Sequence, residues 1–119
     1  MTNQGTAACT DVPRAEQIAR LNDQLRKTGT GGTVVITQGV QHLTGFRAAT
    51  LCAALASYDG FDPDNDPHGE RDFGDITQFG TNLLFKLDYY DKDLQFASDD
   101  PADPAVTNRV LTVMLASDW

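Results

Sequence analysis

Cysteine and long apolar runs are scarce in this sequence, and each absence excludes a class of protein. The two cysteines, Cys9 and Cys52, are too few and too far apart for a disulfide framework or a thiolate metal site. No apolar run approaches the ~20 residues that a membrane-spanning helix requires, so we expect no membrane association. Residues 1–10 lack the basic start and apolar stretch of a signal peptide, which leads us to expect a cytoplasmic protein.

Catalytic motifs are also missing. The chain has no G-x-S-x-G motif, and neither cysteine lies close to a histidine in the sequence, so no nucleophile has an adjacent base. The GTGG segment at 29–32 precedes a predicted strand, whereas a phosphate-binding loop precedes a helix. These absences favour a protein that is not an enzyme and that carries no cofactor.

Negative charge is what the sequence has in excess. It contains 17 acidic and 9 basic side chains, for a net charge of −8. Residues 59–103 alone hold thirteen acidic and three basic side chains, so this segment accounts for the whole excess. Such a surface repels the backbone of nucleic acids, so we expect no direct binding to DNA or RNA. The partner that suits it is a protein with a basic surface.

The residue patterns predict a single α+β domain over residues 11–119, preceded by a disordered tail at 1–10. The expected helices cover residues 13–28 (capped by Asp11), residues 44–58 (capped by Thr44) and a closing segment that starts at Asp103-Pro104 and carries Val106, Val110, Val113 and Met114. The expected strands cover residues 33–38, 75–80, 81–91 and 94–98. This order predicts a mainly antiparallel sheet of about four strands packed against two or three helices.

Alternating apolar side chains identify the clearest strand and its buried face. That face consists of Leu83, Phe85, Leu87 and Tyr89. We expect it to pack on helices that contribute Leu21, Leu55 and Val110. Cys52 lies within the apolar pattern of the second helix and is expected in the core.

Residues 64–74, DNDPHGERDFG, are the densest run of chemically capable side chains, and they allow three interpretations. The first is a site for a divalent metal (Mg, Ca or Mn, or Zn or Fe through the histidine), with Asp64, Asp66, His68, Glu70 and Asp72 as candidate ligands. The spacing is not that of an EF-hand, because Pro67 and Phe73 occupy its glycine and glutamate positions. The second is a proton-transfer pair of the imidazole with Glu70 or Asp72.

The third interpretation, which we favour, is an ordered turn. Four of the five prolines follow an aspartate, and an aspartate in that position can accept hydrogen bonds from downstream backbone N–H groups. Gly69 and Gly74 can supply positive φ angles. An ordered turn still presents an outer face to a partner.

The predicted partner-binding residues are aspartates of the acidic segment: Asp62, Asp64, Asp75, Asp91, Asp93, Asp99 and Asp100. Carboxylates outside the turn hydrogen bonds should contribute most to binding. We expect four residues to be of this kind, since none precedes a proline: Asp75, Asp91, Asp93 and Asp99.

Four segments carry a resemblance to a known family: NDPHGE at 65–70, DFG at 72–74, DYYD at 88–91 and DPADPAV at 100–106. From about residue 15 to about residue 117, the chain resembles a small bacterial family of this length, described as a domain of unknown function. Family members often read NDPHGEHDFG, whereas Arg71 here replaces the second histidine, which weakens a two-histidine metal site.

The resemblance implies a cytoplasmic protein encoded among accessory genes of proteobacteria, plasmids and phages, without an established activity. This setting leads to the hypothesis of an accessory inhibitor, of anti-restriction or anti-CRISPR type, that occupies the nucleic-acid site of a defence complex. The alternative is a metal-binding protein or metal-dependent enzyme that uses residues 64–72.

Overall fold

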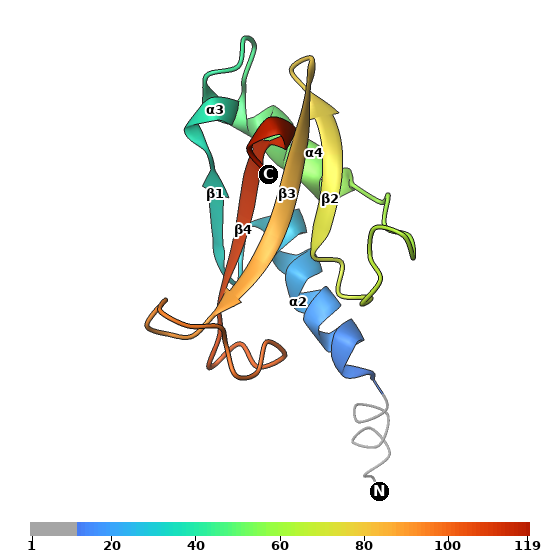
Figure 1. The fold of residues 1–119 in the computed structure, drawn as a ribbon, viewed down its shortest axis with the longest axis vertical. Coiled ribbons are helices and arrows are strands. Elements are labelled where there is room, and N and C mark those ends of the chain that lie inside the picture. Colours follow the sequence, from blue (N-terminus) through green and yellow to red (C-terminus); the bar gives the residue numbers. More distant parts are fainter. Residues whose placement is uncertain (1–11) are drawn as a thin grey trace, which may run out of the picture.

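A computed structural model describes residues 12–119, in which helices and strands follow one another as shown in Figure 1. The predicted tail at 1–10 and the predicted cap Asp11 lie outside these residues. The elements are α2 (Arg14–Thr28), β1 (Thr33–Ile36), α3 (Gln38–Gln41), α4 (Ala48–Ser57), β2 (Phe73–Gln78), β3 (Thr81–Tyr90), β4 (Asn108–Leu115) and the 3-10 turn η1 (Ala116–Asp118). None of the described helices is long and apolar enough to cross a membrane.

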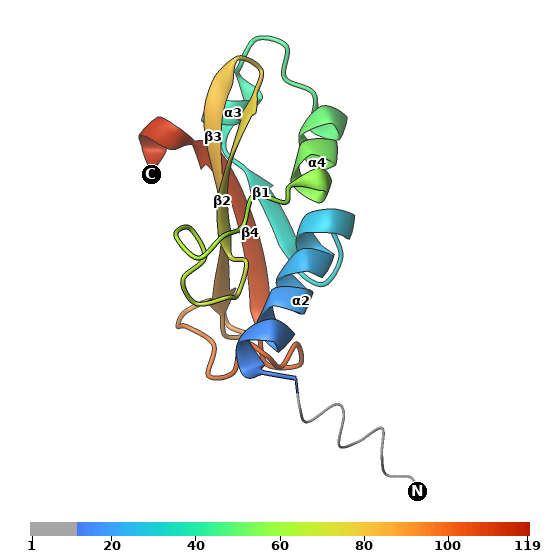
Figure 2. The ribbon, with the colours of Figure 1, turned by 90° about the vertical axis from the view of Figure 1, so that its right-hand side faces the viewer.

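The four strands form one mixed sheet in the order β1-β4-β3-β2. The β2–β3 and β3–β4 pairings are antiparallel, and β1 pairs with β4 in parallel. The helices α2 and α4 cover one face of this sheet (Figure 2). The predicted α+β class is therefore confirmed, with four strands and three helices within residues 12–119.

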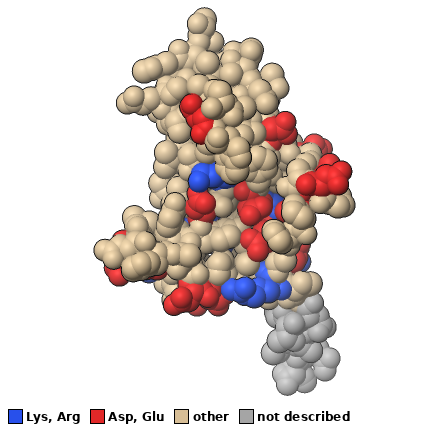
Figure 3. Space-filling view, viewed as in Figure 1, with Lys and Arg blue, Asp and Glu red and all other residues tan. Residues whose placement is uncertain are grey.

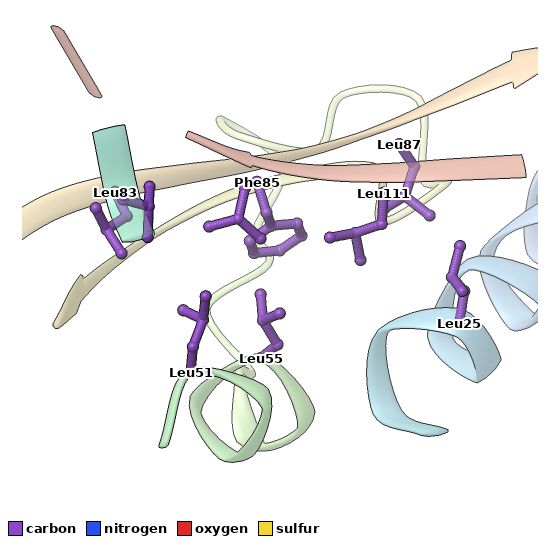
Figure 4. Close-up of a cluster of buried hydrophobic side chains, with 9 residues drawn as sticks. Leu25, Leu51, Leu55, Leu83, Phe85, Leu87 and Leu111 are labelled. Atoms are coloured by element: carbon purple, nitrogen blue, oxygen red, sulfur yellow. The ribbon is translucent and has the colours of Figure 1, made fainter. Parts of the chain in front are cut away.

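The core lies between the sheet and its two covering helices. Leu83, Phe85 and Leu87 of β3 are buried and face this core, as the alternation predicts. Figure 4 shows them beside Leu111 of the neighbouring strand β4 and opposite Leu25 of α2 and Leu51 and Leu55 of α4. Tyr89, the fourth residue of the predicted face, is half-buried.

The buried face of α2 differs from the predicted one, because polar side chains occupy the place expected for Leu21. Leu21 is only half-buried, while Asn22 and Arg26 on the same helix are buried. The buried side chains Ile18, Asn22 and Arg26 follow one another at intervals of four residues, which places them on one face of the helix. The polar members of this face bind the loop described below.

The predicted closing helix is wrong, because residues 108–115 form the strand β4. Asp103 does begin a turn, since its Oδ1 accepts the Ala105 N–H at 2.9 Å, but the turn does not continue. Val110 lies in this strand rather than in a helix and is half-buried. Pairing with β1 on one side and β3 on the other satisfies the backbone of β4, and this tertiary gain outweighs the local helix signal.

The predicted strand at 94–98 is also wrong. These residues belong to a loop, 91–107, which contains a single isolated bridge between Tyr90 and Ala97. Leu94 has a φ of +58°, which extended backbone cannot accommodate. The loop therefore turns instead of adding a strand to the sheet.

The second predicted helix begins later than expected, at Ala48 rather than after Thr44. Gly45 has a φ of +83°, so the backbone cannot be helical there. Within α4, Leu51 and Leu55 are buried, whereas Cys52 is exposed, contrary to its predicted place in the core.

Candidate functional site

The acidic loop, residues 58–72, connects α4 to β2 and begins with a turn built by side chains. Asp62 Oδ1 accepts the N–H groups of Asp64 at 2.8 Å and Asn65 at 3.0 Å. Asn65 in turn accepts the Asp62 N–H and donates to the Gly60 carbonyl. Asp62, a predicted partner-binding residue, thus has a structural task in the turn.

The second half of the acidic loop is held by two further local hydrogen bonds, both to Asp66. Asp66 Oδ1 accepts the Arg71 N–H at 3.0 Å, and Gly69 N donates to the Asp66 carbonyl. Gly69 has the expected positive φ of +72°, whereas Gly74 has none and lies within β2. A Cβ atom at Gly74 would lie 2.6 Å from the Phe85 ring, so close packing explains this glycine.

Glu70 connects the acidic loop to the sheet. Its Oε1 accepts the Tyr89 hydroxyl at 2.8 Å, and its backbone carbonyl accepts the Asn22 side-chain amide at 2.9 Å. The same amide nitrogen also donates to the Tyr89 oxygen at 2.8 Å. Burial raises the pKa of Tyr89, so the hydroxyl keeps its proton as the donor to Glu70.

Arg109 of β4 extends this network into the core. It is buried, and its Nε donates to Asn22 Oδ1 at 2.7 Å while an Nη atom donates to the Pro101 carbonyl. Its guanidinium lies 5.2 Å from the centre of the Tyr89 ring. Burial lowers the pKa of Arg109, and the charge of Glu70 counters that effect. The network therefore joins α2, β3, β4 and both long loops.

Arg71 fastens the outer side of the acidic loop to α2. Its Nε donates to both oxygens of Asp23, at 3.1 and 3.0 Å, and its two Nη atoms donate to the two oxygens of Glu16, each at 3.2 Å. The pKa of Glu16 is lowered by Arg71 first and by Arg20 second. At the position where resembling sequences carry a second histidine, this chain therefore has a double ion pair.

The five candidate metal ligands do not form a common site. Among residues 12–119, no three His, Cys, Asp or Glu side chains form a group that could hold a metal. Asp66 and Glu70 make the hydrogen bonds described above, and Asp64 and His68 are exposed. Burial raises the pKa of Asp72, as do the charges of Glu70 and Asp66. A metal in this loop stays a prediction.

An open cleft of about 760 Å³ separates α2 from the acidic loop. Arg26 and Lys27 line its helix side, while Tyr58, Phe61 and His68 line its loop side. No serine, threonine or cysteine is among the residues that line it, so the cleft offers His68 no aliphatic hydroxyl or thiol to activate. Among the described residues no hydrogen bond joins His68 to Glu70, which binds Tyr89, or to Asp72, so the proton-transfer pair stays a prediction.

The second long loop, residues 91–107, also uses aspartates in its turns. Asp91 Oδ1 accepts the N–H groups of Asp93 and Gln95, each at 3.1 Å. The expectation that Asp91 lies outside the turn hydrogen bonds is therefore wrong; its side chain shapes the turn. Asp100 Oδ1 accepts the Ala102 N–H and pairs with Arg14 at 2.9 Å.

Four predicted partner-binding carboxylates keep their oxygens free. No hydrogen bond or ion pair within residues 12–119 engages the side chains of Asp64, Asp75, Asp93 and Asp99, and all four are exposed. In Figure 3, acidic atoms gather along the right-hand edge and the lower half of the face shown, while its upper left is largely free of charge. The four free carboxylates all belong to the acidic segment, residues 59–103.

Sequence reasoning missed the polar residues that hold the loops, namely Asn22, Arg26, Tyr89 and Arg109. The one available signal was the presence of Asn22 and Arg26 at four-residue spacing from Ile18, on an otherwise apolar helix face. Arg26 donates to the carbonyls of Leu55, at 2.8 Å, and Tyr58, at 3.1 Å, and so satisfies the C-terminal end of α4.

The fold and the site define a small α+β domain with two acidic loops, the acidic loop 58–72 and the aspartate-rich loop 91–107. Hydrogen bonds and ion pairs hold both loops to α2 and to the sheet. The chain belongs to the family described as "Protein of unknown function (DUF3768)", whose sequence model matches residues 36–118. No curated protein and no solved structure matches the chain.

Proposed function

We propose that this protein is a binding module that uses its acidic loops to engage a basic surface on a partner protein. The observation that carries the proposal is the division of the aspartates into two groups. Asp62, Asp91 and Asp100 accept backbone hydrogen bonds and shape the loops. The ordered backbone then presents neighbouring carboxylates, such as Asp93 and Asp99, to solvent.

Ordered carboxylates suit recognition better than a mobile acidic tail would. A partner that binds them does not have to order the loop first, which lowers the entropic cost of association. The negative field also accelerates encounter with a positively charged surface. Protein surfaces that bind DNA or RNA are positively charged. The acidic loops therefore suit a partner that binds nucleic acid, and this protein would inhibit that partner by competing with the nucleic acid.

The resemblance described above supports the same partner class. Two of its four specific segments, NDPHGE and DPADPAV, fall in the loops 58–72 and 91–107, whereas DFG and DYYD fall at the ends of strands β2 and β3. Arg71 replaces a histidine there and makes ion pairs with α2, which favours a loop built for presentation over one built for metal binding. An anti-restriction or anti-CRISPR inhibitor would use such a surface to imitate phosphates.

The test begins with the partner that the immobilised protein retains from extracts of its host. Binding kinetics of the purified pair are measured at about 50 and about 300 mM salt, where the screening length differs more than twofold. We expect Asp93→Lys to slow association. Asp118→Lys changes the net charge equally but lies in η1, which follows β4, whereas the loop 91–107 precedes that strand, so we expect it to leave association unchanged.

Competition with nucleic acid decides the inhibitor hypothesis. DNA or RNA added to the purified pair should displace the protein from its partner. If both bind at once, and Asp93→Lys behaves like Asp118→Lys, the proposal is wrong. The acidity would then serve solubility alone.

A further inference from the structure

The loop 91–107 exposes two large apolar side chains next to its free carboxylates. Phe96 is 71% exposed and Leu94 is 60% exposed. Trp119 is exposed to a similar extent, but its ring lies against Phe73 at a centroid distance of 5.1 Å. Two large apolar side chains that are two residues apart and open to water form an exposed apolar patch, and aromatic side chains are enriched in protein interfaces.

The backbone that carries these side chains is held by hydrogen bonds. Asp91 N donates to the Phe96 carbonyl at 2.8 Å, which closes a short loop around Leu94. Inside that loop, Asp91 Oδ1 accepts two N–H groups, and the Leu94 N–H donates to the Asp91 carbonyl at 3.1 Å. Phe96 and Leu94 are thus presented from a defined backbone, and they are not in a frayed segment.

The same loop is also joined to the sheet. The Asn108 side-chain amide of β4 donates to the carbonyls of Asp91 at 3.2 Å and Lys92 at 3.1 Å, and the Lys92 ammonium donates to the Thr107 carbonyl. Leu94 sits in the left-handed region, at φ +58°, where glycine or asparagine is favoured. A leucine that is exposed in a backbone conformation unfavourable for it has no stabilising role that the fold explains. Figure 1 shows the loop projecting beyond the end of β3.

We infer that Phe96 and Leu94 are an apolar anchor that inserts into a pocket on the partner protein, and that lysine and arginine side chains border this pocket. The inference rests on the proposed function, which supplies the basic partner. Asp93 and Asp99 flank the anchor in the sequence and keep free carboxylates for the border of the pocket. A second copy of this chain would bring the same negative loop to the contact, so charge disfavours self-association through it.

Three variants test the anchor. Phe96→Ser removes the aromatic side chain, and Leu94→Asn removes the aliphatic one while suiting the left-handed backbone. Val35→Thr is the matched control, because Val35 is an exposed apolar residue on the edge strand β1. Since all three positions are exposed, thermal melting should stay unchanged and confirm that the variants fold.

The partner is identified by cross-linking in the host: Phe96 is replaced with the photoreactive p-benzoyl-phenylalanine, and the protein that cross-links to it is determined. With that protein purified, Phe96→Ser and Leu94→Asn should each raise Kd by about tenfold or more, mainly through faster dissociation, whereas Val35→Thr should not. An effect below about twofold for both variants, a failure to cross-link the partner that the parent protein retains, or a cross-link to a second copy of this chain would overturn the inference.

The two proposals can fail separately. If Asp93→Lys weakens binding and Phe96→Ser does not, the acidic binding module stands and the anchor is wrong. If Phe96→Ser weakens binding and neither salt nor Asp93→Lys changes it, the anchor stands and the electrostatic proposal is wrong.

Discussion

Replacing Tyr89 with phenylalanine tests whether the acidic loop is held by the buried polar network. The substitution removes a single oxygen atom and leaves the ring in place beside Arg109, 5.2 Å from its guanidinium. The lost oxygen donates to the Glu70 carboxylate at 2.8 Å and accepts the Asn22 amide at 2.8 Å. Packing is unchanged, so the loss of stability reports the two hydrogen bonds.

The expected magnitude follows from the partners of that oxygen. A hydrogen bond to a charged group contributes about 1.5–3 kcal/mol, and a neutral one contributes about 1 kcal/mol. Asn22 keeps its second bond to the Glu70 carbonyl, and the half-buried Glu70 can recover water, so part of the loss is compensated. We expect Tyr89→Phe to lower the free energy of unfolding by about 2 kcal/mol.

Urea denaturation measures this loss, and the neighbouring residue supplies the control. Tyr90→Phe removes the same atom from a residue that, by the strand alternation, lies on the opposite face of β3. It should cost less than about 0.5 kcal/mol. Hydrogen exchange at the Arg71 amide, which donates to Asp66, should accelerate in the first variant alone. Equal losses for the two tyrosines would refute the network as the support of the loop.

Three further outcomes follow from the core and the acidic loop. Phe85→Ala should lower the free energy of unfolding by about 3–5 kcal/mol, and a loss below about 1 kcal/mol in chemical denaturation would contradict its burial. Asp66→Ala and Gly69→Val should lower stability even with chelator present, while adding Mg, Ca, Mn or Zn should leave the melting temperature of the parent protein unchanged; a rise that saturates near one equivalent would establish the metal site. Because burial raises the pKa of Asp72, its ionisation opposes folding, so Asp72→Asn should gain stability relative to the parent as the pH rises from about 3 to about 7.

The parts of the fold that the sequence predicts correctly are those with a local physical cause. The alternation in β3 identifies its buried face because successive side chains of a strand point to opposite faces. The two strands expected at 75–80 and 81–91 are also found, as the hairpin of β2 and β3, although its turn residues are Phe79 and Gly80, which both adopt positive φ, at +56° and +70°. Such elements depend on a few consecutive residues.

The strand β4 could not be predicted because its cause is not local. Apolar residues occur on both of its faces, so Val110, Val113 and Met114 fit a helical stripe as well as a strand. The Asp103-Pro104 pair reinforces the helical interpretation, although it only produces a turn. Pairing with β1, more than seventy residues away in the sequence, decides the outcome.

The candidate site divides in the same way. The turn at Asp62 could be predicted because an aspartate accepts hydrogen bonds from backbone N–H groups two to four residues away. The same rule holds at Asp91, where our prediction wrongly placed the carboxylate outside the turn hydrogen bonds. The network around Arg109 joins residues as far as 87 positions apart, and no spacing in the sequence reveals it. The structure therefore separates the acidic residues that shape the turns from those that only a function would explain.

The turns require only some of the acidic residues of this protein. Asp62, Asp66, Asp91, Asp100 and Asp103 accept backbone hydrogen bonds, and removing any of them would loosen a loop. The side chains of Asp93 and Asp99 accept no such hydrogen bond within residues 12–119. They nevertheless add negative charge to a segment that is already acidic, and repulsion between like charges destabilises the folded state. Solubility alone could be met by charges spread more evenly over the surface, including the upper left of the face in Figure 3, which is largely free of charge. The two free carboxylates that flank an exposed phenylalanine in this loop are the feature for which we propose a basic partner.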